Sequence, residues 1–148
     1  MTRRQAILAV AAVSLPAPLG AADAGDIWEL LTGAAAALSA GNAPEFMQDF
    51  DRSMPGYSML AAYVSGLTAA YEVESSIEML SEEGSGSTRS VELDWYLELI
   101  EQQDETNTIR RRDRISCRLM KIGKKWKIVA LEPIAFFAPP ATAHQPSR

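Results

Sequence analysis

The chain contains a single cysteine and a single histidine among its 148 residues. Cys117 therefore cannot form a disulfide within the chain, and its position inside an expected strand predicts a small buried side chain. A catalytic zinc site built from several histidines is excluded as well, because His144 stands alone. The sequence also lacks a nucleophile elbow, a glycine-rich phosphate loop and a cysteine pair. We therefore expect no metal, no cofactor and no catalytic residues of a known constellation.

Basic residues are outnumbered, because 14 Lys and Arg stand against 19 Asp and Glu, for a net charge of -5. This balance disfavours a general nucleic-acid-binding role. Residues 110–127 are locally basic, but strand alternation would divide their charges between two faces, so a solvated sheet is favoured over a nucleic-acid or membrane patch. With 47% hydrophobic residues, the chain is suited to one globular domain.

Residues 1–24 have the order of a secretory signal peptide. Arg3 and Arg4 precede an apolar run over residues 6–15, and small residues surround Asp23. The apolar run is too short to span a bilayer, which needs about 20 residues, so we expect no membrane span after cleavage. We expect cleavage after Ala24, with cleavage after Ala22 as the alternative. The protein is then periplasmic or extracellular, exported by general secretion or by the twin-arginine route that the arginine pair resembles.

Hydrophobic spacing divides the remainder into helices followed by strands. Three helices are expected over residues 26–39, 44–50 and 57–71, with Asp26 capping the first and Pro44 in the first turn of the second. From Glu72 onward the period becomes two, which predicts antiparallel strands and an α+β fold with helices on one face of a curved sheet. The strands are expected from 72 to a Gly/Ser-rich loop at 82–90, then over 91–99, 108–122 and 126–137, with a turn at 123–124 and a flexible Pro-rich tail at 139–148.

This order resembles a known superfamily. The helix over 26–39, the FMQDFD segment over 46–51 and the GKKWKIV hairpin over 123–129 are similar to the nuclear transport factor 2-like superfamily, in particular its SnoaL-like and uncharacterised secreted bacterial branch. The resemblance implies that residues 25–138 form a cystatin-like fold, with a cone-shaped sheet wrapped around the N-terminal helices and a pocket between them. It also implies a homodimer that pairs through the outer sheet face.

Strand register locates the expected pocket lining, because a slip of one residue would turn every side chain to the opposite face. Pairing Leu93 with Cys117, and Cys117 with Ala130, places the apolar side chains on one inner face. The outer face would then bring Glu98 beside Arg112. The other expected neighbours are Val91–Leu119, Trp95–Ile115, Leu97–Asp113, Leu99–Arg111 and Leu119–Ile128 on the inner face, with Glu92–Arg118 and Tyr96–Arg114 on the outer face.

The inner face becomes polar toward one end, and this end is the candidate site. Two interpretations stay open: a mutually satisfied ion pair at the mouth of the cone, which we favour, or a ligand site with one carboxylate as general base. A bulge at Pro133 would turn Glu132 outward. The candidate pocket-lining residues are Arg111, Asp113, Glu132, Trp95, Tyr63 and Tyr71.

The expected function is small-ligand or protein binding through the cone pocket by an exported single-domain protein, without catalysis. The alternative is a cofactor-independent lyase, isomerase or hydrolase that uses a pocket carboxylate, with Asp49 or Asp51 as further acidic candidates. An apolar outer patch favours association, since exposed apolar groups contiguous over a sheet often mark an interface. Its expected members are Tyr96, Ile100, Met120, Val129 and Leu131.

Overall fold

Three helices precede four strands along the chain in the computed structural model, which describes residues 17–140. The first 16 residues of the expected signal peptide, and His144 in the expected tail, lie outside these residues. The elements are α1 (Ala17–Ser39), α2 (Ala43–Met47), α3 (Tyr57–Ala70), β2 (Tyr71–Ser85), β3 (Thr88–Glu101), β4 (Thr108–Ile122), β5 (Lys125–Glu132) and the 3-10 helix η2 (Ile134–Phe137).

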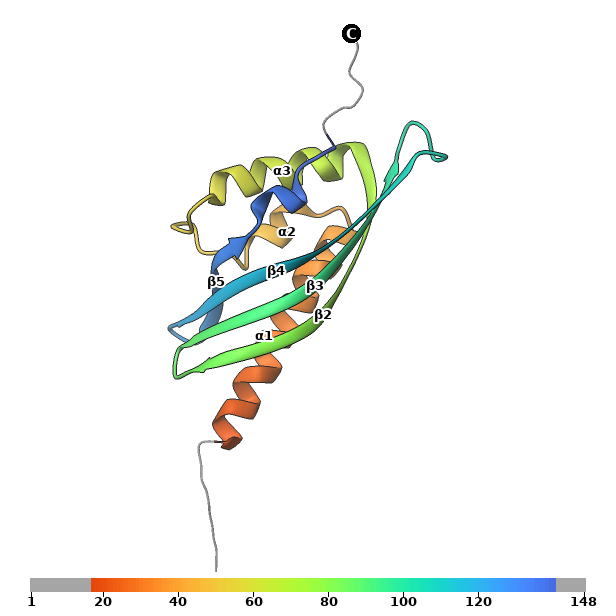
Figure 1. The fold of residues 1–148 in the computed structure, drawn as a ribbon. Coiled ribbons are helices and arrows are strands. Elements are labelled where there is room, and N and C mark those ends of the chain that lie inside the picture. Colours follow the sequence, from red (N-terminus) through yellow and green to blue (C-terminus); the bar gives the residue numbers. More distant parts are fainter. Residues whose placement is uncertain (1–16, 141–148) are drawn as a thin grey trace, which may run out of the picture.

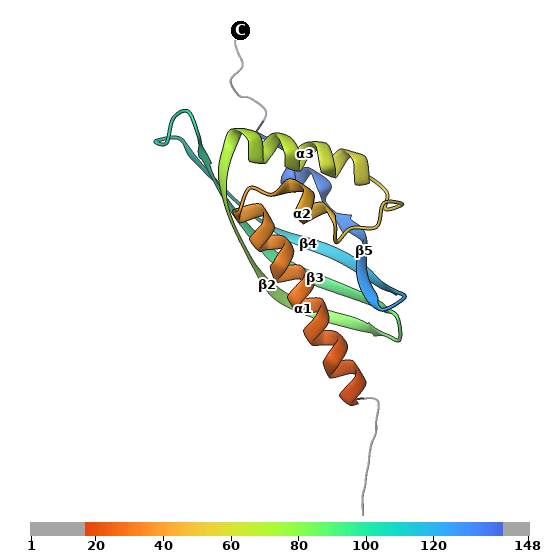
Figure 2. The same cartoon turned by 180° about the vertical axis from the view of Figure 1, so that it is seen from behind.

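The strands form one curved antiparallel sheet in the order β2-β3-β4-β5. Figures 1 and 2 show α1, α2, α3 and η2 on the same side of this sheet, and no described element covers its other side. The α+β fold class predicted from the sequence is therefore confirmed. Two faces of different character result: a concave inner face under the helices and an open outer face.

Helix α1 begins earlier than expected. The predicted N-cap, Asp26, lies inside the helix and is exposed, because the helix already starts at Ala17. Residues 17–25 include several alanines, which are strong helix formers, and Pro18 stands in the first turn, where proline is tolerated, so the helix extends before Asp26 despite Gly20 and Gly25. Helix α2 begins as predicted, with Pro44 in its first turn and the Asn42 side chain accepting a hydrogen bond from the Glu45 amide.

The prediction of a loop over residues 82–90 is wrong. Strands β2 and β3 continue through it and leave only a two-residue turn, Gly86-Ser87, between Ser85 and Thr88. Gly86 has a φ of 63°, a conformation that glycine adopts at little cost, and it allows this short turn.

The predicted pairing of β3 with β4 is displaced by two residues. Leu93 lies opposite Ile115 rather than Cys117, and Trp95 lies opposite Asp113. A displacement of two leaves every side chain on its predicted face, so alternation alone does not distinguish the two registers. The fully buried side chains of β3 confirm the predicted inner face: Val91, Leu93, Leu97 and Leu99.

The pairing of β4 with β5 starts as predicted and then shifts. Leu119 lies opposite Ile128, but an irregularity follows, so that Cys117 pairs with Leu131 instead of Ala130. Leu131 is consequently buried and Glu132 exposed, the reverse of the predicted orientation of both. Strand β5 also ends at Glu132 rather than Phe137, because Pro133 has no N–H for the ladder.

Candidate functional site

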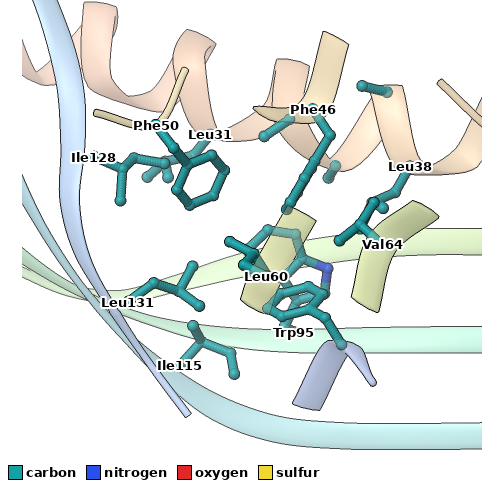
Figure 3. Close-up of a cluster of buried hydrophobic side chains, with 14 of the residues drawn as sticks. Leu31, Leu38, Phe46, Phe50, Leu60, Val64, Trp95, Ile115, Ile128 and Leu131 are labelled. Carbon is teal, nitrogen blue, oxygen red and sulfur yellow. The ribbon is translucent and has the colours of Figure 1, made fainter. Parts of the chain in front are cut away.

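Aromatic side chains fill the concave side of the sheet. The ring centroid of Trp95 lies 6.4 Å from that of Phe46 and 5.1 Å from that of Phe137, and Phe46 lies 5.0 Å from Phe50. Figure 3 shows Phe46, Phe50 and Trp95 converging from α2, the segment after it and β3. Phe46 and Phe137 have no exposed surface and Trp95 has 1%, so side chains of the chain itself occupy the space at the centre of the fold.

The C-terminal 3-10 helix supplies part of this filling. Phe136 and Phe137 come from η2, which follows the early end of β5, and their rings lie 5.0 Å apart in an edge-to-face arrangement. Arg111 on β4 donates a hydrogen bond of 2.7 Å to the carbonyl oxygen of Phe136. Burial lowers the pKa of the half-buried Arg111 guanidinium. The candidate ligand-binding arginine is therefore engaged with the backbone of η2.

Trp95, a second candidate, is part of the same packing and has its polar group satisfied. Its Nε1 donates to Ser75 Oγ at 2.8 Å, and the Ser75 amide donates to Ser39 Oγ at 2.9 Å. These bonds link β3, β2 and the exposed C-terminal end of α1. A buried indole N–H needs an acceptor, so this bond explains why a serine stands at position 75, within reach of Trp95 Nε1.

Tyr71 and Tyr63 are placed differently from each other. Tyr71 is buried at the start of β2, where burial and the nearby Glu101 carboxylate raise its pKa. It also lines an open cleft together with Gln102, Glu72 and residues of the α1 C-terminus. Tyr63 is half-buried on α3 and lines none of the clefts described here.

The two candidate carboxylates lie at the surface. Asp113 is exposed, and its side chain accepts a hydrogen bond of 2.8 Å from the Arg114 amide. Glu132 is exposed beside a shallow cleft formed with Gly56 and Ile134. In residues 17–140, no hydrogen bond or ion pair joins any two of Arg111, Asp113 and Glu132. The structure does not assemble the polar cluster that the predicted register implied.

Asp49 and Asp51 flank the edge of β5. The Asp51 amide donates to the Ile128 carbonyl, and the Ile128 amide donates to the Asp49 carbonyl, both at 2.9 Å. Burial raises the pKa of the Asp49 carboxyl, against the effect of Lys127. These bonds give the segment a structural role, since they cover the open edge of the strand.

The outer sheet face carries ion pairs between β3 and β4. Arg114 lies 3.0 Å from Glu92, and Ser116 Oγ donates to the same carboxylate at 2.8 Å. The hydrogen bond from Ser116, followed by that from Arg114, lowers the pKa of Glu92. Partners of opposite charge were predicted here, but the displaced register changes which residues meet. The remaining contacts are Arg110–Glu98 at 3.6 Å, Arg112–Asp94 at 3.5 Å and the Arg112 guanidinium 5.6 Å from the Tyr96 ring centroid.

The expected apolar patch on this face is smaller than predicted. Leu131 is buried and Val129 is half-buried, whereas Met120 is 40% exposed. Charges dominate instead, and they are divided by strand: β2 presents exposed glutamates at 72, 74 and 78, and β4 presents exposed arginines at 110, 112, 114 and 118. Within the described chain, no ion pair is formed by Glu72, Glu74, Glu78 or Arg118.

Arg89 was missed by the sequence analysis, which placed it in a loop. Among residues 23–140 it is the one charged residue that is almost fully buried, with 7% of its surface exposed. Its guanidinium lies 3.5 Å from the Glu82 carboxylate and 3.7 Å from that of Asp23, and 5.6 Å from the Trp126 ring centroid. Extending the alternation of Val91 back by two residues would have indicated its inward position.

Comparisons with known proteins support the fold. No protein-family model and no curated protein sequence matches the chain. Similar solved structures include a protein of unknown function from Mycobacterium tuberculosis, with 13% identity, a TM-score of 0.68, and coverage of 78% of this chain and 73% of that one. A proposed scytalone dehydratase from Novosphingobium aromaticivorans has 9% identity, a TM-score of 0.70, and coverage of 78% and 85%.

A third neighbour carries the family name that the sequence resemblance suggested. It is a nuclear transport factor 2-like protein of unknown function from Shewanella oneidensis, with 17% identity, a TM-score of 0.59, and coverage of 74% of this chain and 96% of that one. In the described part of the chain, no helix has the length and apolar character needed to cross a membrane. Identities this low establish the fold alone, and the chain has the nuclear transport factor 2-like, or cystatin-like, fold.

Proposed function

We propose that the chain is an exported, non-catalytic binding protein that associates through its outer sheet face. One observation carries this proposal: side chains of the chain itself fill the concave interior, whereas the opposite sheet face has no described element over it. The candidate carboxylates for catalysis, Asp113 and Glu132, are exposed and separate from the aromatic interior. Export rests on the signal-like order of residues 1–24.

The partner that best fits this face is a second copy of the chain. A two-fold axis running along β3 between two facing sheets places β2 of one copy opposite β4 of the other. The exposed glutamates of β2 then meet the arginines of β4 twice, once on each side of the axis. Such complementarity favours the correct partner and speeds association, while Met120 and Tyr96 add apolar contact.

Charge exchange tests this arrangement. One variant carries Glu74→Lys with Glu78→Lys, and a second carries Arg110→Glu with Arg114→Glu, because the strand registers place these two arginines level with the two glutamates. In the facing arrangement the first variant brings lysines against the β4 arginines of the other copy, and the second brings glutamates against its β2 glutamates. Neither variant should therefore self-associate, whereas an equimolar mixture should form a heterodimer in sedimentation experiments. Glu105→Lys, in the exposed loop between β3 and β4, is the control and should leave association unchanged. A wild-type chain that stays monomeric at high concentration and low salt would contradict the proposal.

A cofactor-independent lyase, isomerase or hydrolase is the second candidate function. It is supported by the structural neighbour that is a proposed scytalone dehydratase, and by the clefts that Tyr71 and Glu132 line. Ligand screening should compare the wild type with Asp113→Asn and Glu132→Gln. Ligand binding that neither substitution alters would remove both carboxylates from the candidate site.

A further inference from the structure

We propose that the leader peptide is removed immediately before Asp23, at the Ala22–Asp23 bond, and that Asp23 remains in the mature protein as part of its fold. This inference rests on the proposed export. Leader peptidases require small residues three and one positions before the cleaved bond, and Gly20 and Ala22 stand at these positions. A leader peptidase would hydrolyse the bond, with the hydroxyl of water going to the Ala22 carbonyl carbon and a proton to the Asp23 nitrogen.

Asp23 makes contacts with the sheet that a residue of a removed leader peptide would not need. It lies in α1, and its side chain is only 13% exposed. One carboxylate oxygen lies 3.7 Å from the Arg89 guanidinium, and the other lies 3.4 Å from Lys121 Nζ, 98 residues later in the chain. The first turns of α1 are thus bonded to β3 and β4 at the end of the sheet where β2 and β3 turn.

The charge balance of this cluster depends on Asp23. Arg89 and Lys121 both lie near the Trp126 ring, at 5.6 and 6.0 Å from its centroid, and their carboxylate neighbours are Asp23 and Glu82. Two cations and two carboxylates therefore neutralise each other. Cleavage after Ala24 would leave both cations with Glu82 alone, and the Arg89 side chain is only 9% exposed. Removing one partner from a buried ion pair is strongly destabilising, because the remaining charge is poorly solvated.

Asp26 provides a matched control in the same helix. It lies three residues later, is exposed, and forms no ion pair with any residue of the described chain. Loss of its charge should therefore have little effect on folding.

The first experiment determines the N-terminus of the processed chain. The full sequence is expressed in a bacterium that exports proteins, and the protein of the periplasmic fraction is measured by intact mass. A chain that starts at Asp23 supports the inference, and one that starts at Gly25 or later overturns it while leaving export intact. A chain found unprocessed in the cytoplasm contradicts both the export and the cleavage, so the two failures are distinguishable.

The second experiment tests whether Asp23 belongs to the fold, and it does not depend on export. Asp23→Asn and Asp26→Asn are introduced separately into the full chain, purified without processing. Asp23→Asn should lower the melting temperature by roughly 3 °C or more, and Asp26→Asn should leave it nearly unchanged. The Asp23 effect should persist in moderate salt, because partly buried pairs are weakly screened. Equal melting temperatures for the two variants would overturn the structural role of Asp23.

Discussion

Arg111 on β4 donates a 2.7 Å hydrogen bond to the carbonyl oxygen of Phe136 and so joins the sheet to η2. The same bond places the Phe136–Phe137 pair against Trp95, at the centre of the aromatic cluster. A residue that the sequence analysis considered for ligand binding thus holds the segment that fills the interior.

Replacing Arg111 with methionine should loosen η2. The substitution keeps an apolar side chain but leaves the Phe136 carbonyl without its charged donor, and such a bond contributes about 1.5–3 kcal/mol. Urea unfolding should show a loss in that range, and hydrogen exchange should increase over residues 134–137. Arg110→Met is the control, since Arg110 is exposed in a surface ion pair that contributes about 1 kcal/mol or less. Equal losses in both variants would contradict the role assigned to Arg111.

Phe137→Ala should open a cavity beside Trp95. Phe137 is fully buried between α3 and the sheet, and truncating such a ring costs about 3–5 kcal/mol of stability. The vacated space is lined by apolar side chains, so it should bind a small aromatic molecule such as indole that the wild type does not bind. Met59→Ala, at a half-exposed position of α3, should change neither property. Calorimetric titration that finds no binding to the Phe137 variant would show that the core collapses around the gap.

Cys117 should make the protein less stable in alkali. Burial raises the pKa of its thiol to about 12, whereas an unfolded thiol has a pKa of about 8.5. Between these values the unfolded state releases the proton and the folded state keeps it, so stability falls as the pH rises through this window. Cys117→Ala removes the titrating group. Its unfolding free energy should therefore fall less than that of the wild type between about pH 8 and about pH 11. Parallel pH profiles for the two proteins would contradict this account.

Ser116→Ala should raise the pKa of Glu92. The hydrogen bond from the Ser116 hydroxyl to the Glu92 carboxylate lowers this pKa more than the hydrogen bond from Arg114 does. A lowered pKa stabilises the folded state above the unfolded pKa, and this contribution is lost as the pH falls through the folded value. An NMR titration of the Glu92 side chain should show the shift in the variant. Ser76→Ala, on β2 of the same sheet, should leave the Glu92 titration unchanged.

Much of the fold was predictable because it depends on local periodicity. The boundaries of α3 and β4 follow from spacings of three to four and of two, and Pro44 and Gly123 mark a helix start and a turn. The inward face of β3 was predictable for the same reason, since the side chains that alternate with its charged residues are apolar.

The candidate site was not predictable to the same extent. Alternation does not distinguish registers two residues apart, so the partners of Trp95 and the outer arginines were misassigned. The irregularity beside Leu119 also reverses the predicted orientations of Leu131 and Glu132. The sequence around Val129 carries no local signal that indicates this irregularity. The site residues depend on long-range pairing, which sequence periodicity does not encode.

By itself the sequence determined the α+β class, the absence of an internal disulfide and the faces of the central strands, because composition and period-two alternation are local properties. Only the tertiary structure decided that η2 turns back after Pro133 and fills the interior with Phe136 and Phe137. The same is true of the buried Arg89, whose carboxylate partners come from α1 and β2. The physical reason is that burial and ion pairing depend on segments far apart in the chain, and these meet only when the helices pack on the sheet.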